Sequence, residues 1–193
     1  TFGCFNNSSK ISENCINVWT KIFNNIKDCR LIIKASTKDS EIAQKKILEK
    51  FKKNNVDISR IIFVNHKKDK INHLKTYQDI DISLDTFPYP GVTTSFESIW
   101  MGVPVLTKKG NNFVSRCGES INLNLELKEF IANDDNDYVK IAKELNENRE
   151  KISIIRKSLR EKSLNSPLFD KKSFGDDFCN KMQDIWHKKV SNK

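Results

Sequence analysis

The chain has 193 residues, of which 37% are hydrophobic and 31% are charged, and its formal net charge is +9. This length can bury a sizeable core in one domain, so a small disulfide-stapled scaffold is not needed. The charged residues are spread over helical patterns, which argues against a disordered chain. The lysines are not interleaved with aromatic residues and accompany no nucleic-acid motif, so we predict no nucleic-acid partner.

The cysteines and histidines argue against two further classes of site. Five cysteines are an odd number with no C-x-x-C pair, which predicts reduced, mostly buried thiols in a cytoplasmic protein. The three histidines are too dispersed for a metal centre, so we predict no metal.

No apolar run approaches the roughly 20 residues of a membrane span, so we predict no membrane partner. Because Thr1 lies inside an expected strand, we expect the chain to be a piece of a longer protein.

The first half of the chain alternates short buried strands with amphipathic helices. Apolar residues recur at helical spacing in the helices and stand in short runs in the strands. This alternation predicts an α/β fold, a Rossmann-like parallel sheet with helices on both faces. The expected elements are a strand at Thr1–Asn6, a helix at Ile11–Ile26, a strand at Arg30–Ala35, a helix at Asp39–Asn54, a strand at Ile61–Val64 and a polar loop with a short helix at Lys67–Tyr77.

The centre of the sequence, Asp81–Thr107, repeats this order around a turn rich in proline and glycine. We predict a buried strand at Ile82–Asp85, a short helix at Thr94–Met101 and a second buried strand at Val103–Leu106. The turn ends in two threonines at the helix start, where unpaired N–H groups and the helix dipole favour an anion. We therefore expect a phosphate at this turn.

A helix-capping role competes with the phosphate prediction. Thr94 and Glu97 fit a capping box, in which each side chain satisfies an N–H group of the other residue. The periodicity of the sequence alone favours the capping role. Only the residues of the whole stretch, taken together, favour a phosphate-binding role. Glu97 can hold both roles.

The rest of the chain is mainly helical, and Ser166 and Pro167 interrupt it before its last helix. We predict one α/β domain at residues 1–165 and a C-terminal helical extension at 166–193. Three tryptophans, Trp19, Trp100 and Trp186, are expected in the core. The expected elements are a loop and helix at Gly110–Asn122, a strand at Phe130–Ala132 and helices at Tyr138–Asn148, Ile152–Ser163 and Lys172–Lys189, the last with an apolar stripe at Phe178, Met182 and Ile185.

Candidate site residues lie in the loops that follow the strands, because ligands bind at the carboxyl ends of the strands in a parallel sheet. Three polar loops qualify, at Asn7–Lys10, Lys67–His73 and Phe87–Thr94. None of them matches the G-x-G-x-x-G or P-loop pattern, which lowers the weight of dinucleotide oxidoreductases and P-loop NTPases.

Four side chains in or beside these loops can meet a nucleotide. Lys10 can neutralise a phosphate, and Lys70 and His73, one helical turn apart, can face one site. The carboxylate of Glu97 can accept hydrogen bonds from two ribose hydroxyls. Taken alone, such residues are more often ordinary surface groups, or a cap in the case of Glu97.

The segment LDTFPYPGVTTSFESIWMGVPVLT, followed by GNNFVSR, FIAND and SPLFD, resembles the catalytic region of the O-linked N-acetylglucosamine transferases and their SPINDLY-type relatives. Several motifs in the right order, over nearly the whole chain, make this resemblance specific. The family has the GT-B fold of two Rossmann-like domains, usually preceded by tetratricopeptide repeats. The resemblance implies that this chain is the C-terminal, nucleotide-sugar-binding half, and that the N-terminal half and the repeats are absent from it.

The resemblance also implies a diphosphate site. Asn7 stands where the family often has a glutamine near the diphosphate, and Lys10 where it has a lysine on the phosphates, which implies a catalytic role for Lys10. Thr93 and Thr94 match the paired threonines at the diphosphate. Val92 stands where the well-studied animal enzymes carry a histidine, so any role of that side chain near the donor is absent here.

A nucleoside site is implied beside it. Lys70 and His73 match residues beside the uridine, with His73 stacking on the base, and Glu97 matches the acidic residue that holds the ribose. The resemblance implies no cofactor and no metal ligand, because the nucleotide sugar is the donor substrate.

The function implied is that of the donor-binding half of a protein O-glycosyltransferase. It would transfer N-acetylglucosamine from UDP-N-acetylglucosamine to a Ser or Thr hydroxyl of an acceptor protein, with inversion and without a metal. A general base would lie on the absent half, so we expect this chain alone to bind the donor nucleotide without turnover. Two alternatives stay open: a fucosyltransferase that uses GDP-fucose, and a non-catalytic nucleotide-binding or interaction domain.

Overall fold

The computed structural model describes residues 1–35, 40–65, 67 and 69–191. Its centre is a six-stranded sheet with the order β3-β2-β1-β4-β5-β6, in which every pair of neighbouring strands is parallel. This arrangement confirms the predicted Rossmann-like parallel sheet. The strands are β1 (Phe2–Cys4), β2 (Leu31–Ala35), β3 (Ile61–Asn65), β4 (Ile82–Leu84), β5 (Val105–Lys108) and β6 (Ile131–Ala132).

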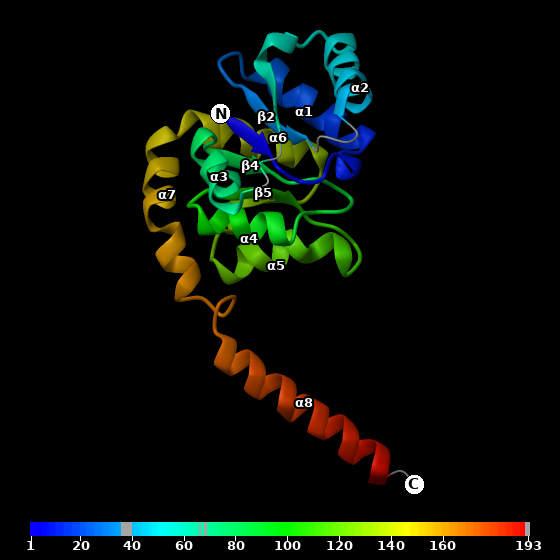
Figure 1. Ribbon diagram of the computed structural model, residues 1–193, viewed down its shortest axis with the longest axis vertical. Coiled ribbons are helices and arrows are strands. Elements are labelled where there is room, and N and C mark those ends of the chain that lie inside the picture. The colour runs from blue at the N-terminus through cyan, green and yellow to red at the C-terminus, as the bar shows by residue number, and fades with distance from the viewer. Residues whose placement is uncertain (36–39, 66, 68, 192–193) are drawn as a thin grey trace.

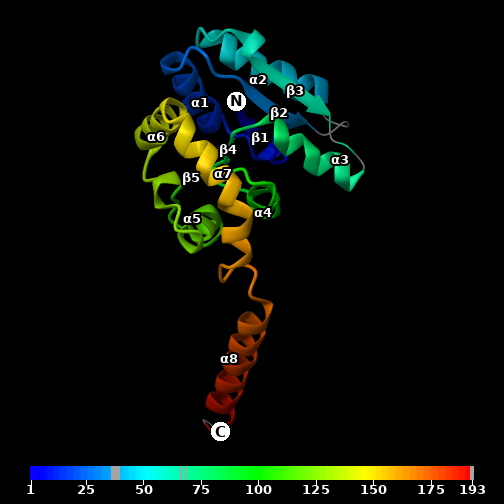
Figure 2. The ribbon, with the colours of Figure 1, turned by 90° about the vertical axis from the view of Figure 1, so that its left-hand side faces the viewer.

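Helices cover both faces of this sheet (Figures 1 and 2). α1 packs beside α2 and α6 on one face, whereas α3 and α4 lie on the other. The last helix, α8, projects away from the rest of the molecule (Figure 1). The helices are α1 (Glu13–Asn25), α2 (Ser40–Lys53), α3 (Lys70–Lys75), α4 (Thr93–Trp100), α5 (Cys117–Asn124), α6 (Asp135–Glu147), α7 (Arg149–Leu164) and α8 (Lys171–Ser191).

The buried apolar side chains of β2 belong to two separate clusters. Successive side chains of a strand point to opposite faces, so Leu31 and Ile33 of β2 join the larger apolar cluster, which also contains Trp19 of α1. Ile32, between them, joins the smaller cluster with Tyr77. The short 3-10 helix η3 (Thr76–Asp79) carries Tyr77 and follows α3 directly. The smaller cluster therefore supports α3 and η3 above the sheet.

The end of α4 explains why the following strand begins later than predicted. Gly102 has a positive φ of 75°, which suits the residue just past a helix end. The N–H of Val103 donates to the carbonyl of Ser98 at 2.8 Å, so Val103 closes the helix instead of opening the strand. Pro104 has no N–H to donate. The predicted strand at Val103–Leu106 is therefore corrected to β5, Val105–Lys108.

The predicted extension at 166–193 contains α8, which has no buried residue. Its exposed apolar side chains include Trp186, so the prediction that Trp186 belongs to the core was wrong. Residues 192–193 of the predicted extension lie outside the described residues, as does Asp39 of the predicted second helix. The domain boundary at 165 stays a prediction. The exposed apolar residues of α8 are Phe174, Phe178, Met182, Ile185, Trp186 and Val190.

All five cysteines are free thiols. Cys4, Cys15 and Cys29 are buried, which matches the prediction of mostly buried, reduced thiols. In the part of the chain that the structure describes, no helix combines the length and apolarity that crossing a membrane requires.

Candidate functional site

The strand order reverses between β1 and β4, which are neighbours at the centre of the sheet. In doubly wound folds the crevice at such a point, beyond the carboxyl ends of the strands, is where ligands bind. The loops after β1 and β4 meet there. Lys10 Nζ donates to the carbonyl oxygen of Pro90 at 3.1 Å and lies 4.1 Å from the ring centroid of Tyr89. The structure thus brings two of the three predicted loops together.

A buried carboxylate, Asp85, holds the loop after β4 in shape. Asp85 Oδ1 accepts hydrogen bonds from the N–H groups of Gly91 at 2.7 Å and Thr86 at 2.9 Å. It also accepts one from Asn6 Nδ2 at 3.1 Å, which ties the loop after β1 to the same anchor. Oδ2 accepts from Thr107 Oγ1 at 2.9 Å. Burial raises the pKa of Asp85 to about 6, although these hydrogen bonds lower it in part.

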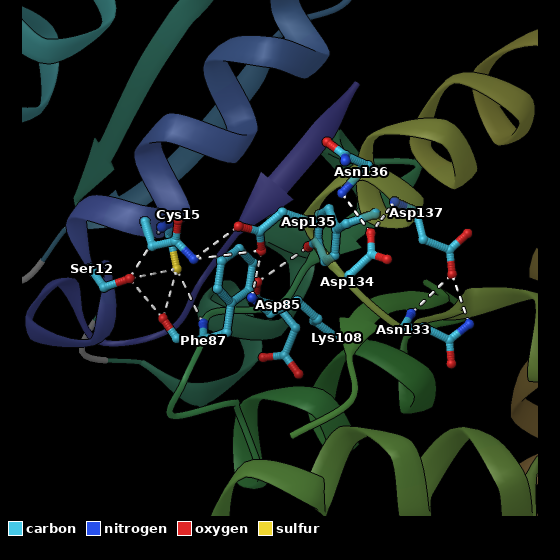
Figure 3. Close-up of polar contacts among 12 residues, drawn as sticks. Ser12, Cys15, Asp85, Phe87, Lys108, Asn133, Asp134, Asp135, Asn136 and Asp137 are labelled. Atoms are coloured by element: carbon cyan, nitrogen blue, oxygen red, sulfur yellow. Dashed lines mark hydrogen bonds and ion pairs between the residues drawn. The ribbon is translucent and has the colours of Figure 1, made fainter. Parts of the chain in front are cut away.

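The start of α1 is fastened to the same loop, as Figure 3 shows for the Cys15 thiol between Ser12 and Phe87. Ser12 caps α1 by accepting from the Cys15 N–H, and its hydroxyl donates to the Phe87 carbonyl at 2.7 Å. The Phe87 N–H donates to Cys15 Sγ at 3.1 Å. Burial raises the pKa of the Cys15 thiol, so it stays a neutral structural partner. Several hydrogen bonds therefore join the start of α1 to the loop after β4.

The amino end of α4 lies at this crevice, and no side chain caps it. Its N-cap residue is Val92, which makes no capping hydrogen bond, so the capping box predicted for Thr94 and Glu97 is absent. Thr93 is exposed. A β carbon at Gly91 would lie 2.6 Å from Asn6 Oδ1 and 2.7 Å from Ser95 Oγ, so a larger residue would displace these side chains. The first N–H groups of α4 remain available to an anion, supported by the positive end of the helix dipole.

Glu97, one helical turn into α4, is part of a polar network instead of a cap. Its Oε2 lies 3.0 Å from His73 Nε2 of α3 and accepts from the Tyr77 hydroxyl at 3.1 Å. His73 Nδ1 lies 3.0 Å from Lys34 Nζ, at the end of β2. Burial lowers the pKa of Lys34 to about 8, and the nearby Glu97 opposes this shift. The network joins β2, α3 and α4 at the mouth of the crevice.

Two predicted site residues stand apart from these contacts. The Asn7 side chain accepts from the Ser9 N–H at 3.0 Å and caps the 3-10 helix η1 (Ser8–Lys10). Lys70 is exposed at the first turn of α3, and within the described residues its side chain makes no hydrogen bond or ion pair. Among the described residues, no group of three or more His, Cys, Asp or Glu side chains could hold a metal ion.

Sequence reasoning gave no role to three residues of this site: Asp85, Tyr77 and Lys34. A lysine within a short apolar strand was the available signal for Lys34, because lysine is almost never fully buried unless it is paired. The signal for Asp85 was its place directly after the central buried strand. Nothing in the local sequence distinguished Tyr77 from an ordinary core tyrosine.

Gly118→Ala is expected to lower the free energy of unfolding by about 1–3 kcal/mol, because overpacking displaces its neighbours. A β carbon at Gly118 would lie 2.2 Å from Thr107 Oγ1 and 2.7 Å from Asp85 Oδ2, two atoms that already bond each other. Urea denaturation would measure the loss. Gly175→Ala on α8 is the matched control, since nothing lies within 4 Å of a β carbon there. Equal stability of both variants would contradict the tight contact.

Comparison with known proteins matches this chain to one family. The sequence profile of glycosyl transferase family 41 matches residues 1–178. A probable UDP-N-acetylglucosamine–peptide N-acetylglucosaminyltransferase SPINDLY from Eustoma exaltatum subsp. russellianum is 34% identical over 193 residues. That match covers 97% of this chain and 20% of the relative, so the chain spans about a fifth of the length of such curated relatives.

Solved structures agree with this match. An O-GlcNAc transferase from Thermobaculum terrenum superposes with a TM-score of 0.89 at 29% identity, over 97% of this chain and 36% of that one. The Anabaena protein HepE, solved in complex with UDP, superposes with a TM-score of 0.64 at 13% identity, over 95% of this chain and 48% of that one. The second likeness shows the fold alone.

Proposed function

This chain belongs to glycosyl transferase family 41, and from that premise we propose that it is the donor-binding half of a protein O-glycosyltransferase. The reaction would transfer N-acetylglucosamine from UDP-N-acetylglucosamine to a Ser or Thr hydroxyl, with inversion and without a metal. One observation carries the proposal: the Lys10 amine meets the loop that leads into the uncapped amino end of α4, at the reversal of strand order. A cation and free N–H groups at such a point suit a nucleotide diphosphate.

In this proposal the diphosphate lies between Lys10 and the first turn of α4. The N–H groups at Thr93 and Thr94, with their hydroxyls, and the Lys10 ammonium stabilise the charge that develops on the departing nucleotide diphosphate. These groups are held in place before the reaction, because Asp85 fixes the loop that precedes the helix. Asn7 would contact the diphosphate through its exposed side chain.

The nucleoside would lie beside α3. His73 would stack on the base, Lys70 would contact it from the same helix, and Glu97 would accept hydrogen bonds from the ribose hydroxyls. His73 and Glu97 come from different helices but lie 3.0 Å apart, which is consistent with one shared nucleoside site. Val92 supplies no imidazole near the donor, so leaving-group stabilisation would depend on Lys10 and the α4 amides.

The remainder of the enzyme would lie outside these residues. We propose that an N-terminal Rossmann-like half supplies the general base and the acceptor cleft, and that tetratricopeptide repeats precede it in a cytoplasmic protein. Residues 1–165 would form the nucleotide-sugar-binding domain and 166–193 the extension. The exposed apolar stripe of α8, which includes Phe178 and Met182, would pack against the N-terminal half.

We expect UDP to bind this chain at least about tenfold more tightly than GDP, which corresponds to about 1.4 kcal/mol. The name of the SPINDLY relative from Eustoma contains UDP-N-acetylglucosamine, and the site offers His73 and Lys70 to the base. Isothermal titration calorimetry with UDP and, separately, GDP measures the difference.

Two other results of this titration would change the proposed function. Tighter binding of GDP would move the proposal to a GDP-fucose-dependent fucosyltransferase. Binding of neither nucleotide would favour a non-catalytic interaction domain that has kept the fold, or a site that only the N-terminal half completes.

A further inference from the structure

Lys34 is the one lysine of the described residues classed as buried, at 5% exposure, and nothing in the proposed donor site uses it. It is the fourth residue of β2, and strand alternation sends its side chain to the same face as Ile32, toward α3. Its amine lies 4.4 Å from the ring centroid of Phe5 and 5.1 Å from that of Tyr77. Aromatic faces attract a cation, so this pocket suits a charged lysine.

The polar partner of this amine is His73. Lys34 Nζ lies 3.0 Å from His73 Nδ1 and 3.4 Å from Nε2, and Nε2 lies 3.0 Å from Glu97 Oε2. An ammonium group can only donate, so Nδ1 accepts and carries no proton. A carboxylate can only accept, so Nε2 carries the proton. This pair of partners selects the tautomer of His73 that carries its proton on Nε2.

We propose that Lys34 is a positioning residue, which fixes the tautomer and the ring orientation of His73 and so prepares it to receive the nucleobase. The inference rests on the proposed function, in which His73 stacks on the base. Lys34 acts through His73 and not on the ligand, because its amine is enclosed by Phe5, Tyr77 and the imidazole. With its pKa lowered to about 8 by burial, the amine remains mostly charged at neutral pH.

The network continues from His73 to the diphosphate end of the site. The Tyr77 hydroxyl, which bonds Glu97, also lies 3.3 Å from the carbonyl oxygen of Thr94 in the first turn of α4. Lys34, His73, Glu97 and Tyr77 therefore connect the base end of the crevice with its phosphate end. A residue that orders His73 would also order the ribose-binding carboxylate.

Lys34→Met tests the proposal, because methionine keeps the apolar stem and removes the charge and the donor. Nitrogen NMR of the ligand-free chain at pH 7 reads the tautomer of His73, assigned by its loss in His73→Gln. We expect an unprotonated Nδ1 and a protonated Nε2 in the wild type, and a mixture of the two tautomers in Lys34→Met. The same spectrum in both proteins would overturn the inference.

Calorimetry with UDP supplies the second readout. We expect Lys34→Met to bind UDP about tenfold more weakly, the loss of roughly one hydrogen bond. Its urea midpoint should not fall, because an apolar side chain replaces a buried amine. Lys45→Met, on an exposed face of α2, is the control and should change neither value. A shifted tautomer with unchanged UDP affinity would overturn the positioning role, whereas wild-type protein that binds no nucleotide would refute the proposed function and leave the tautomer test valid.

Discussion

Replacing Lys10 by alanine is expected to weaken UDP binding about 10- to 150-fold. A charge-assisted hydrogen bond to a phosphate contributes roughly 1.5–3 kcal/mol, and each 1.4 kcal/mol is a factor of ten in affinity. Lys10 meets the loop that leads into α4, where its amine reaches the Pro90 carbonyl. Titration calorimetry of the wild type and the variant measures the loss.

Two controls distinguish a lost phosphate contact from a general loss of stability in Lys10→Ala. Lys45→Ala removes the same charge from α2, and we expect an unchanged affinity because Lys45 is exposed and lies outside the loops that form the crevice. The free energy of unfolding of Lys10→Ala should change by less than about 1 kcal/mol, because the lysine is only half-buried and donates one hydrogen bond to the protein. An unchanged UDP affinity in Lys10→Ala would remove Lys10 from the phosphate site.

The sheet could be predicted because periodicity and burial act on each element locally. The ends of the helices were less predictable, since they depend on the hydrogen bonds of capping residues. α6 begins at Asp135 and not at the predicted Tyr138, because Asp134 accepts from the N–H groups of Asn136 and Asp137. The exposure of Trp186 could not be predicted from the sequence either. An aromatic residue at helical spacing has the same pattern whether or not a partner covers it.

The candidate site was predictable where it depended on chain position, and not where it depended on contacts across the fold. Lys10 and Thr93 lie in loops that any doubly wound sheet brings to one edge. Glu97 matched a capping box equally well, and that role is removed by the start of α4 at Val92 and by the contact of Glu97 with His73. Lys34 reaches His73 across 39 residues of sequence, which no local pattern encodes.

Asp85→Ala is expected to lower the free energy of unfolding by about 3–5 kcal/mol. Alanine would leave the N–H groups of Thr86 and Gly91 without their acceptor in a buried place, and each unpaired buried donor costs roughly 1–3 kcal/mol. Asn6 and Thr107 would lose a partner as well. Urea denaturation measures the loss as a shift of the midpoint.

Asp85→Asn is the matched control for this loss. The Oδ1 of the new asparagine can accept hydrogen bonds from the N–H groups of Thr86 and Gly91. Its Nδ2 can donate to Thr107 Oγ1, since a hydroxyl also accepts. We therefore expect Asp85→Asn to lose less than about half as much stability as Asp85→Ala. Equal losses in the two variants would show that the charge of Asp85, and not its role as an acceptor, stabilises the loop.

Asp85 also makes stability depend on pH. Burial raises the pKa of its carboxyl group from the ordinary value of 3.8 to about 6 in the folded protein. Between these two values the folded state binds the proton more tightly than the unfolded chain, so the contribution of Asp85 to stability falls as pH rises from about 4 to 6. Asp85→Asn has no proton to lose there, and its stability relative to the wild type should improve over this range. A difference in unfolding free energy that stays constant from pH 4 to 7 would mean that the hydrogen bonds from Gly91, Thr86, Asn6 and Thr107 offset the burial of the charge.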